Sequence, residues 1–98
     1  MGNLFELGRI VATPGVLEQL TQEEIIECIE RHSRGEWGSV PPEDVAENEK
    51  SLKAGHRLLS AYDVRGIKVW VITEAVSSSD ETGALSRAST CLLLPSEY

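Results

Sequence analysis

The stretch HRLLSAYDVRGIKVWVITEA, residues 56–75, decides the fold, because it is the most hydrophobic and most regularly patterned part of the chain. Two runs rich in leucine, β-branched and aromatic residues flank the tetrapeptide DVRG, residues 63–66. Asp at the first position and Gly at the last favour a type I turn that is closed by a residue with positive φ. The stretch therefore predicts a β-hairpin.

The register of this hairpin decides which side chains share a face, since side chains alternate along a strand. We expect Asp63 to pair with Ile67, because this register keeps like residues together. One face is then aliphatic and belongs in the core: Leu59, Ala61, Ile67, Val69 and Val71. The other, mixed face carries His56, Leu58, Ser60, Tyr62, Lys68, Trp70, Ile72 and Glu74. A slip of one residue would instead place the second strand's aliphatic residues beside Ser60 and Tyr62.

Proline, glycine and capping residues divide the rest of the chain. Pro14 and Pro42 each suit the first position of a helix, and Thr21 with Glu24 forms a capping box. The second helix has an apolar stripe that we assign to Ile25, Ile26, Cys28 and Ile29. The expected elements are a strand at 8–13, helices at 15–20, 22–33 and 43–54, the hairpin, and a strand at 88–94.

These elements predict one α+β domain over residues 1–98, in the order β-α-α-α-β-β-β. We expect a four-stranded antiparallel sheet with about three helices on one face. The polar, serine-rich segment 76–87 is expected to be a flexible loop.

The net charge of −7 is unevenly distributed. Residues 18–49 hold ten acidic and two basic residues, whereas the remainder holds six acidic and seven basic ones. This balance argues against a protein that binds phosphate backbones, so we expect no direct nucleic-acid binding. The acidic segment has two interpretations: a solvated surface that keeps the chain soluble, or a DNA mimic of the anti-restriction type that presents carboxylates to a DNA-binding enzyme.

The sequence has no pattern typical of a metal or cofactor site. His32 and His56 are far apart, as are Cys28 and Cys91, so we expect no metal and free thiols in a reducing cytoplasm. There is no glycine-rich phosphate loop, and we expect no cofactor. No apolar run approaches the length of a membrane span.

One polar group of residues suggests chemistry. His56, Arg57 and Glu74, with Tyr62 and His32 as further members, could gather at the edge of the sheet and perform acid–base work on a phosphodiester. On that hypothesis the protein is a small metal-independent, nuclease-like enzyme with His56, Arg57 and Glu74 as catalytic residues. The competing interpretation is a cross-strand His–Glu pair with an arginine stem covering the sheet, in a protein that is not an enzyme.

The mixed hairpin face also suggests a binding surface. Antiparallel sheets covered on one side leave the other face to solvent, where an apolar patch usually marks an interface. The predicted binding surface consists of Leu58, Tyr62, Trp70 and Ile72, and we expect a protein partner or a second copy to bind it. The alternative is that residues 95–98 or the serine-rich segment cover this face in a monomer.

Several segments together resemble a family of small bacterial proteins found on plasmids, phages and other mobile elements. The segments are Arg31-His32, GEWG at 35–38, LLSAY at 58–62, VWVITEA at 69–75 and LLLPSEY at 92–98. The resemblance implies a bacterial cytoplasmic setting and a role in mobile-element biology, and it supplies no catalytic residues. Some members are labelled as related to type I restriction systems, but this chain has no S-adenosylmethionine loop and is too short for a methyltransferase domain. The resulting prediction is a small acidic protein-interaction or accessory module.

Overall fold

The computed structural model describes residues 4–79 and 85–98. The first half of the chain forms strand β1 (Arg9–Ala12) and helices α1 (Pro14–Gln19), α2 (Gln22–Ser33) and α3 (Pro42–Ala54). The second half forms strands β2 (Leu58–Val64), β3 (Ile67–Thr73), β4 (Val76–Ser79), β5 (Leu85–Arg87) and β6 (Ser89–Leu93), followed by the 3₁₀ helix η1 (Pro95–Glu97). The α+β class and the predicted hairpin are confirmed.

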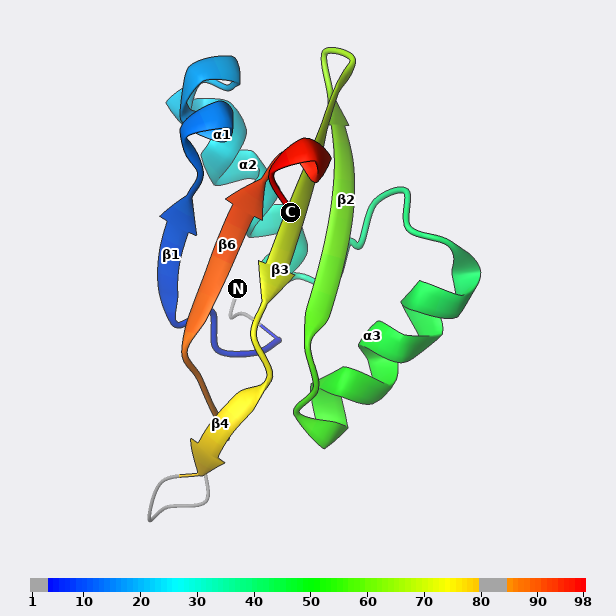
Figure 1. Ribbon diagram of the computed structural model, residues 1–98. Coiled ribbons are helices and arrows are strands. Elements are labelled where there is room, and N and C mark those ends of the chain that lie inside the picture. The colour runs from blue at the N-terminus through cyan, green and yellow to red at the C-terminus, as the bar shows by residue number, and fades with distance from the viewer. Residues whose placement is uncertain (1–3, 80–84) are drawn as a thin grey trace.

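The main sheet has four strands in the order β1-β6-β3-β2, and it is mixed rather than antiparallel (Figure 1). β3 runs antiparallel to both of its neighbours, β2 and β6, but β1 runs parallel to β6. The prediction of a purely antiparallel sheet was therefore wrong. β1 and β6 both lead into a helical turn at the same end of the sheet, where the Thr13 hydroxyl donates to the Glu97 carboxylate.

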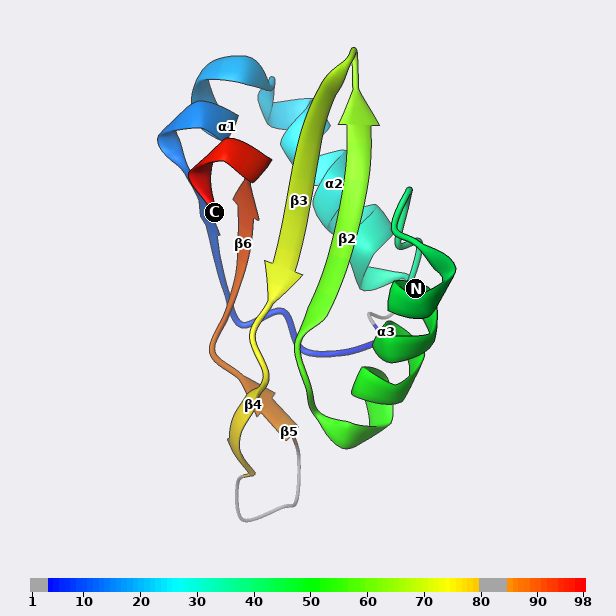
Figure 2. The same cartoon turned by 45° about the vertical axis from the view of Figure 1, so that its right-hand side comes forward.

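The helices do not all lie on one face. α1 and α2 cover one side of the sheet, whereas α3 lies beside the edge strand β2 (Figures 1 and 2). The side chain of Asn48 on α3 explains this position, because its amide binds the backbone of β2 as a neighbouring strand would. Asn48 Nδ2 donates to the Leu59 carbonyl at 2.7 Å, and the Leu59 N–H donates to Asn48 Oδ1 at 3.0 Å.

The hairpin register differs by one residue from the prediction. Val64 pairs with Ile67, so the turn contains only Arg65 and Gly66, both with positive φ (53° and 84°). Two such residues form a type I′ turn, which matches the twist of the strands. Arginine seldom adopts this conformation, which costs about 1–2 kcal/mol.

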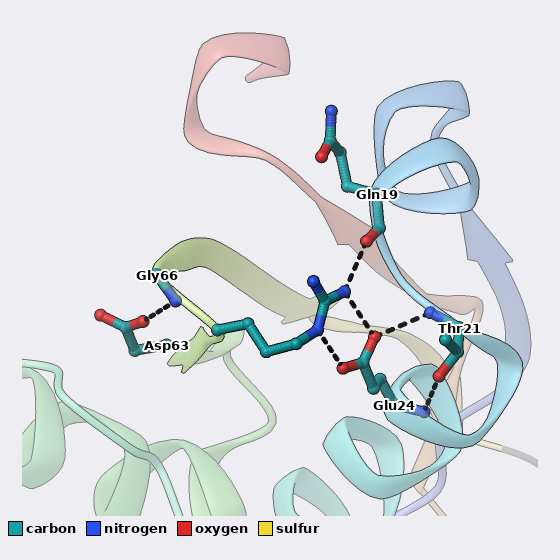
Figure 3. Close-up of polar contacts among 6 residues, drawn as sticks. Gln19, Thr21, Glu24, Asp63 and Gly66 are labelled. Atoms are coloured by element: carbon teal, nitrogen blue, oxygen red, sulfur yellow. Dashed lines mark hydrogen bonds and ion pairs between the residues drawn. The ribbon is translucent and has the colours of Figure 1, made fainter.

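Contacts to the end of α1 and the start of α2 hold Arg65 in place. Its guanidinium donates to both Glu24 carboxylate oxygens and to the Gln19 carbonyl, with the shortest bond to Glu24 at 2.6 Å. Figure 3 shows Glu24 also engaged with Thr21, in the predicted capping box. The pKa of Glu24 falls to about 2, chiefly because of the Arg65 hydrogen bond. A contact between two residues that are 41 positions apart in sequence thus holds the turn in this conformation.

The core lies between the sheet and helices α1 and α2. Its buried residues are Val16, Leu20, Cys28, Tyr62, Val69, Val71 and Leu92. The buried stripe of α2 differs from the prediction, because Ile26 is 47 % exposed and His32 is fully buried. The stripe is therefore Ile25, Cys28, Ile29 and His32, which have the i, i+3, i+4, i+7 spacing of one helical face.

The segment predicted as a flexible loop, 76–87, contains two strands in its described parts. β4 and β5 pair antiparallel as a second, two-stranded sheet, and residues 80–84 lie outside the described residues. Among the described helices, none has the length and apolar character that crossing a membrane requires.

Candidate functional site

The sheet face opposite α1 and α2, here called the open face, has apolar rows running across its strands. The register aligns Val11, Cys91, Ile72 and Leu59 in one row. The next row contains Leu93, Trp70 and Ala61. An antiparallel sheet in contact with water normally has a polar outer face. These two central rows are apolar instead, and no α-helix of the described residues lies over this face (Figure 2).

Two hollows on the open face share Trp70 as a lining residue, and we together call them the Trp70 groove. Each has a volume of about 360 Å³, and both are lined by Trp70 and Leu59. The first is also lined by Arg57, Leu58, Ile72 and Tyr98. The second is bordered by Ser39, Val40, Pro41, Asp44, Ala61, Lys68 and Pro95. The groove therefore combines an apolar floor with Arg57 at one end and Lys68 at the other.

The C-terminal turn covers part of this face. The Glu97 carboxylate accepts hydrogen bonds from the Thr13 hydroxyl, from the Gly15 N–H at 3.0 Å and from the Leu94 N–H at 3.0 Å. These bonds lower the pKa of Glu97, and the bond from Thr13 contributes most. Tyr98 then stacks edge-on against Trp70, with ring centroids 5.5 Å apart. Tyr98 remains 72 % exposed, so it forms a wall of the groove and leaves its mouth open.

The predicted binding surface is divided between the two faces of the sheet. Trp70 and Ile72 lie on the open face, where Ile72 is 7 % exposed, whereas Leu58 and Tyr62 lie on the opposite face and are 0 % and 2 % exposed. Grouping all four on one face was wrong, because the register is shifted by one residue. Leu58 borders the first hollow without exposing any surface, and Tyr62 donates its hydroxyl hydrogen to the Glu36 carbonyl. Leu59, which was assigned to the core, belongs to the groove.

The proposed catalytic residues do not converge on a pocket. Arg57 pairs with Glu74 at 3.6 Å, and both side chains are about half exposed. His56 precedes β2, is exposed, and lines neither hollow of the Trp70 groove. His32 is buried under the opposite face. The structure thus brings Arg57 and Glu74 together, but as a solvated ion pair beside the groove.

Arg87 is a buried cation that the sequence reasoning missed. It is 5 % exposed, and its guanidinium donates to the carbonyls of Ser51, His56 and Glu74 at 2.7–3.0 Å. Burial lowers its pKa from the ordinary value of arginine. These bonds join the end of α3 to the ends of the hairpin. His56 therefore contributes a backbone carbonyl to this junction.

His32 is the centre of a buried hydrogen-bond chain. Its Nε2 lies 2.8 Å from the Thr73 hydroxyl, which lies 2.8 Å from the Thr90 hydroxyl, and Thr90 donates to the Leu7 carbonyl at 2.7 Å. Because Thr90 donates its single hydroxyl hydrogen to the Leu7 carbonyl, the Thr73 hydroxyl must donate to Thr90. His32 Nε2–H must then donate to Thr73. Nδ1 is then unprotonated and accepts from the Ser60 hydroxyl.

This chain leaves His32 neutral. Burial, and secondarily the nearby Arg87 charge, lower the pKa of His32 to about 3. The Ser60–His32 bond has the form of an activated nucleophile and its base. Both residues are fully buried, however, so no substrate reaches the hydroxyl. The arrangement links α2, the hairpin, β6 and the N-terminal segment, and its role is structural.

The described residues include no group of three or more His, Cys, Asp or Glu side chains placed to hold a metal ion. Comparison with protein-family models, curated proteins and solved structures found no match for this chain. The functional argument therefore rests on the geometry of the open face.

Proposed function

We propose that this chain is a protein-interaction module of bacterial mobile elements that acts in the cytoplasm without catalytic activity of its own. Its binding site is the Trp70 groove. The observation that supports this proposal most strongly is the apolar groove on a sheet face that the three α-helices leave uncovered.

The composition of the groove indicates the chemistry of its partner. Trp70 and Leu59 line both hollows, so an apolar side chain entering either one would bury surface against them. Tryptophan and arginine are enriched among residues that dominate binding energy. Arg57 and Lys68 supply hydrogen-bond donors at the two ends, each beside a carboxylate: Arg57 pairs with Glu74 at 3.6 Å, and Asp44 borders the same hollow as Lys68. We propose a protein segment with an apolar anchor.

Site-specific photo-cross-linking in the cells from which the chain comes would test this function. A photoreactive residue replaces Leu59, which lines both hollows, and a matched control replaces Glu47, which is exposed on α3. We expect one discrete protein adduct from position 59 and none of that mass from position 47. Adding Trp70→Ala should remove the adduct. The same adduct from both positions, or one that survives Trp70→Ala, would be evidence against the groove.

The hypothesis of an anti-restriction DNA mimic rests on the acidity of residues 18–49. Part of that charge is compensated, because Glu36 pairs with Arg34 at 2.8 Å and with Arg31 at 3.5 Å. A mimic should weaken the binding of a restriction complex to DNA at low salt, and a titration without such an effect would exclude it.

A further inference from the structure

The two edges of the main sheet differ in whether their outward backbone groups have hydrogen-bond partners. At the β2 edge, Asn48 occupies the backbone groups of Leu59, and the Ala61 N–H donates to the Trp37 carbonyl at 3.0 Å. The Ala61 carbonyl accepts from the Ser39 N–H at 2.8 Å. An unpaired edge strand invites pairing with another chain, and covering it prevents this. The fold therefore closes its β2 edge with its own residues.

The β1 edge has no comparable cover in the part of the chain that the structure describes. Arg9 and Thr13 donate their N–H groups to Ala88 and Leu92 of the β6 side, both at 3.0 Å. Alternation along a strand then points the N–H and C=O groups of Ile10 and Ala12 away from β6. No hydrogen bond among the described residues reaches these four groups, and Figure 1 shows β1 as the outermost strand on its side.

The side chains of β1 also favour an intermolecular contact. Ile10 is 46 % exposed and Val11 is 37 % exposed, whereas natural edge strands usually carry charge or proline to discourage pairing. The only charged residue of β1 is Arg9, at its beginning. The edge is therefore apolar along most of its length, and it lies outside the acidic segment 18–49.

We propose that β1 pairs with β1 of a second copy of this chain, antiparallel and about a two-fold axis at Val11. In this register Ile10 of one copy exchanges both backbone hydrogen bonds with Ala12 of the other, which uses all four free groups on each copy. Val11 meets Val11 of the second copy on the open face. The result is a continuous eight-stranded sheet whose two Trp70 grooves lie on the same side.

Charge complementarity supports a second copy as the occupant. The register places Arg9 of one copy directly opposite Thr13 of the other, and both side chains lie on the open face. The Thr13 hydroxyl is bonded to the Glu97 carboxylate, so each Arg9 guanidinium comes next to a carboxylate of the other copy. No two like charges stand directly opposite each other in this register. β1 has only 4 residues. Pairing it with a second copy therefore buries less surface than the about 1,200–2,000 Å² of a standard interface, and the dimer is weak.

Sedimentation from about 1 μM to about 1 mM chain would test the proposal. Val11→Lys places two ammonium groups opposite each other at the axis and should weaken dimerisation by about tenfold or more. Val45→Lys is a matched control, because Val45 is a valine of equal exposure, 37 %, on α3 at the other edge. We expect Val45→Lys to dimerise like the wild type.

Amide hydrogen exchange distinguishes this interface from association through the groove. The N–H groups of Ile10 and Ala12 should become protected as the concentration rises, in the wild type and in Trp70→Ala alike. A wild type that stays monomeric at about 1 mM, or a dimer in which these two amides exchange as fast as in the monomer, would overturn the proposal. So would a Val11→Lys variant that dimerises normally. None of these results bears on partner binding at Trp70.

Discussion

Acidification should destabilise this fold through His32, because its imidazole is buried in the neutral form. The pKa of His32 is about 3 in the folded protein, against 6.5 for an exposed imidazole. Between these two pH values, His32 therefore binds a proton in the unfolded chain but not in the folded chain. Stability is complete above pH 6.5 and is lost as the pH falls toward 3.

The size of the effect follows from the pKa difference. One pKa unit corresponds to about 1.36 kcal/mol, so at about pH 4.5, two units below the unfolded pKa, the loss is between about 2 and 3 kcal/mol. Protonation of carboxylates with a lowered pKa, such as Glu24 and Glu97, also destabilises the folded protein in acid. A comparison variant is needed to isolate the contribution of His32.

His32→Gln serves as that variant, because an amide keeps one acceptor for Ser60 and one donor for Thr73 but does not titrate. Urea unfolding of both proteins at about pH 7.5 and pH 4.5 gives the change in their stability difference. We expect the wild type to lose between about 2 and 3 kcal/mol more than the variant. If both proteins lose the same free energy, the reasoning about a buried neutral imidazole is refuted. An NMR titration of the wild-type imidazole, expected flat above about pH 4, checks the result independently.

Three further predictions concern other parts of the molecule. Asn48→Ala should lower the free energy of unfolding by about 2 kcal/mol in urea denaturation, because the edge groups of Leu59 lose both partners; an unchanged midpoint would contradict the edge assignment. Removing Tyr98 should increase the quenching of Trp70 fluorescence by iodide, and equal quenching would show that the C-terminal turn does not shield it. His56→Ala should cleave RNA and DNA at the same background rate as the wild type, and a wild-type excess would revive the nuclease hypothesis.

The location of the hairpin and of the helices could be predicted from sequence because their signals are local. Pro14, Pro42 and the Thr21–Glu24 capping box mark helix starts through backbone chemistry that lies within a few residues. The register could not be predicted, because the positive φ of Arg65 is held by contacts to Glu24 of α2 and Gln19 of α1, which are distant in sequence.

The candidate site depended on that register, so only part of it was predicted. Trp70 and Ile72 were correctly placed on the face opposite the core, whereas Leu58 and Tyr62 were exchanged with Leu59 and Ala61. The position of β1 beside β6 also had no local signal, since a parallel partner is chosen by the whole sheet. The burial of His32 did have a signal: its spacing from Ile25, Cys28 and Ile29 continues the buried stripe of α2.

The claim that Trp70 anchors a protein partner is tested most directly by affinity, once cross-linking has identified that partner. Its Kd is measured for the wild type, Trp70→Ala and Tyr62→Phe. Tyr62 is buried on the opposite face, so losing its hydroxyl tests whether a change in the core alone affects binding. We predict that Trp70→Ala weakens binding by about tenfold or more, as expected for an interface hot spot, while Tyr62→Phe leaves it unchanged. Equal affinity of Trp70→Ala and the wild type would contradict the proposed function.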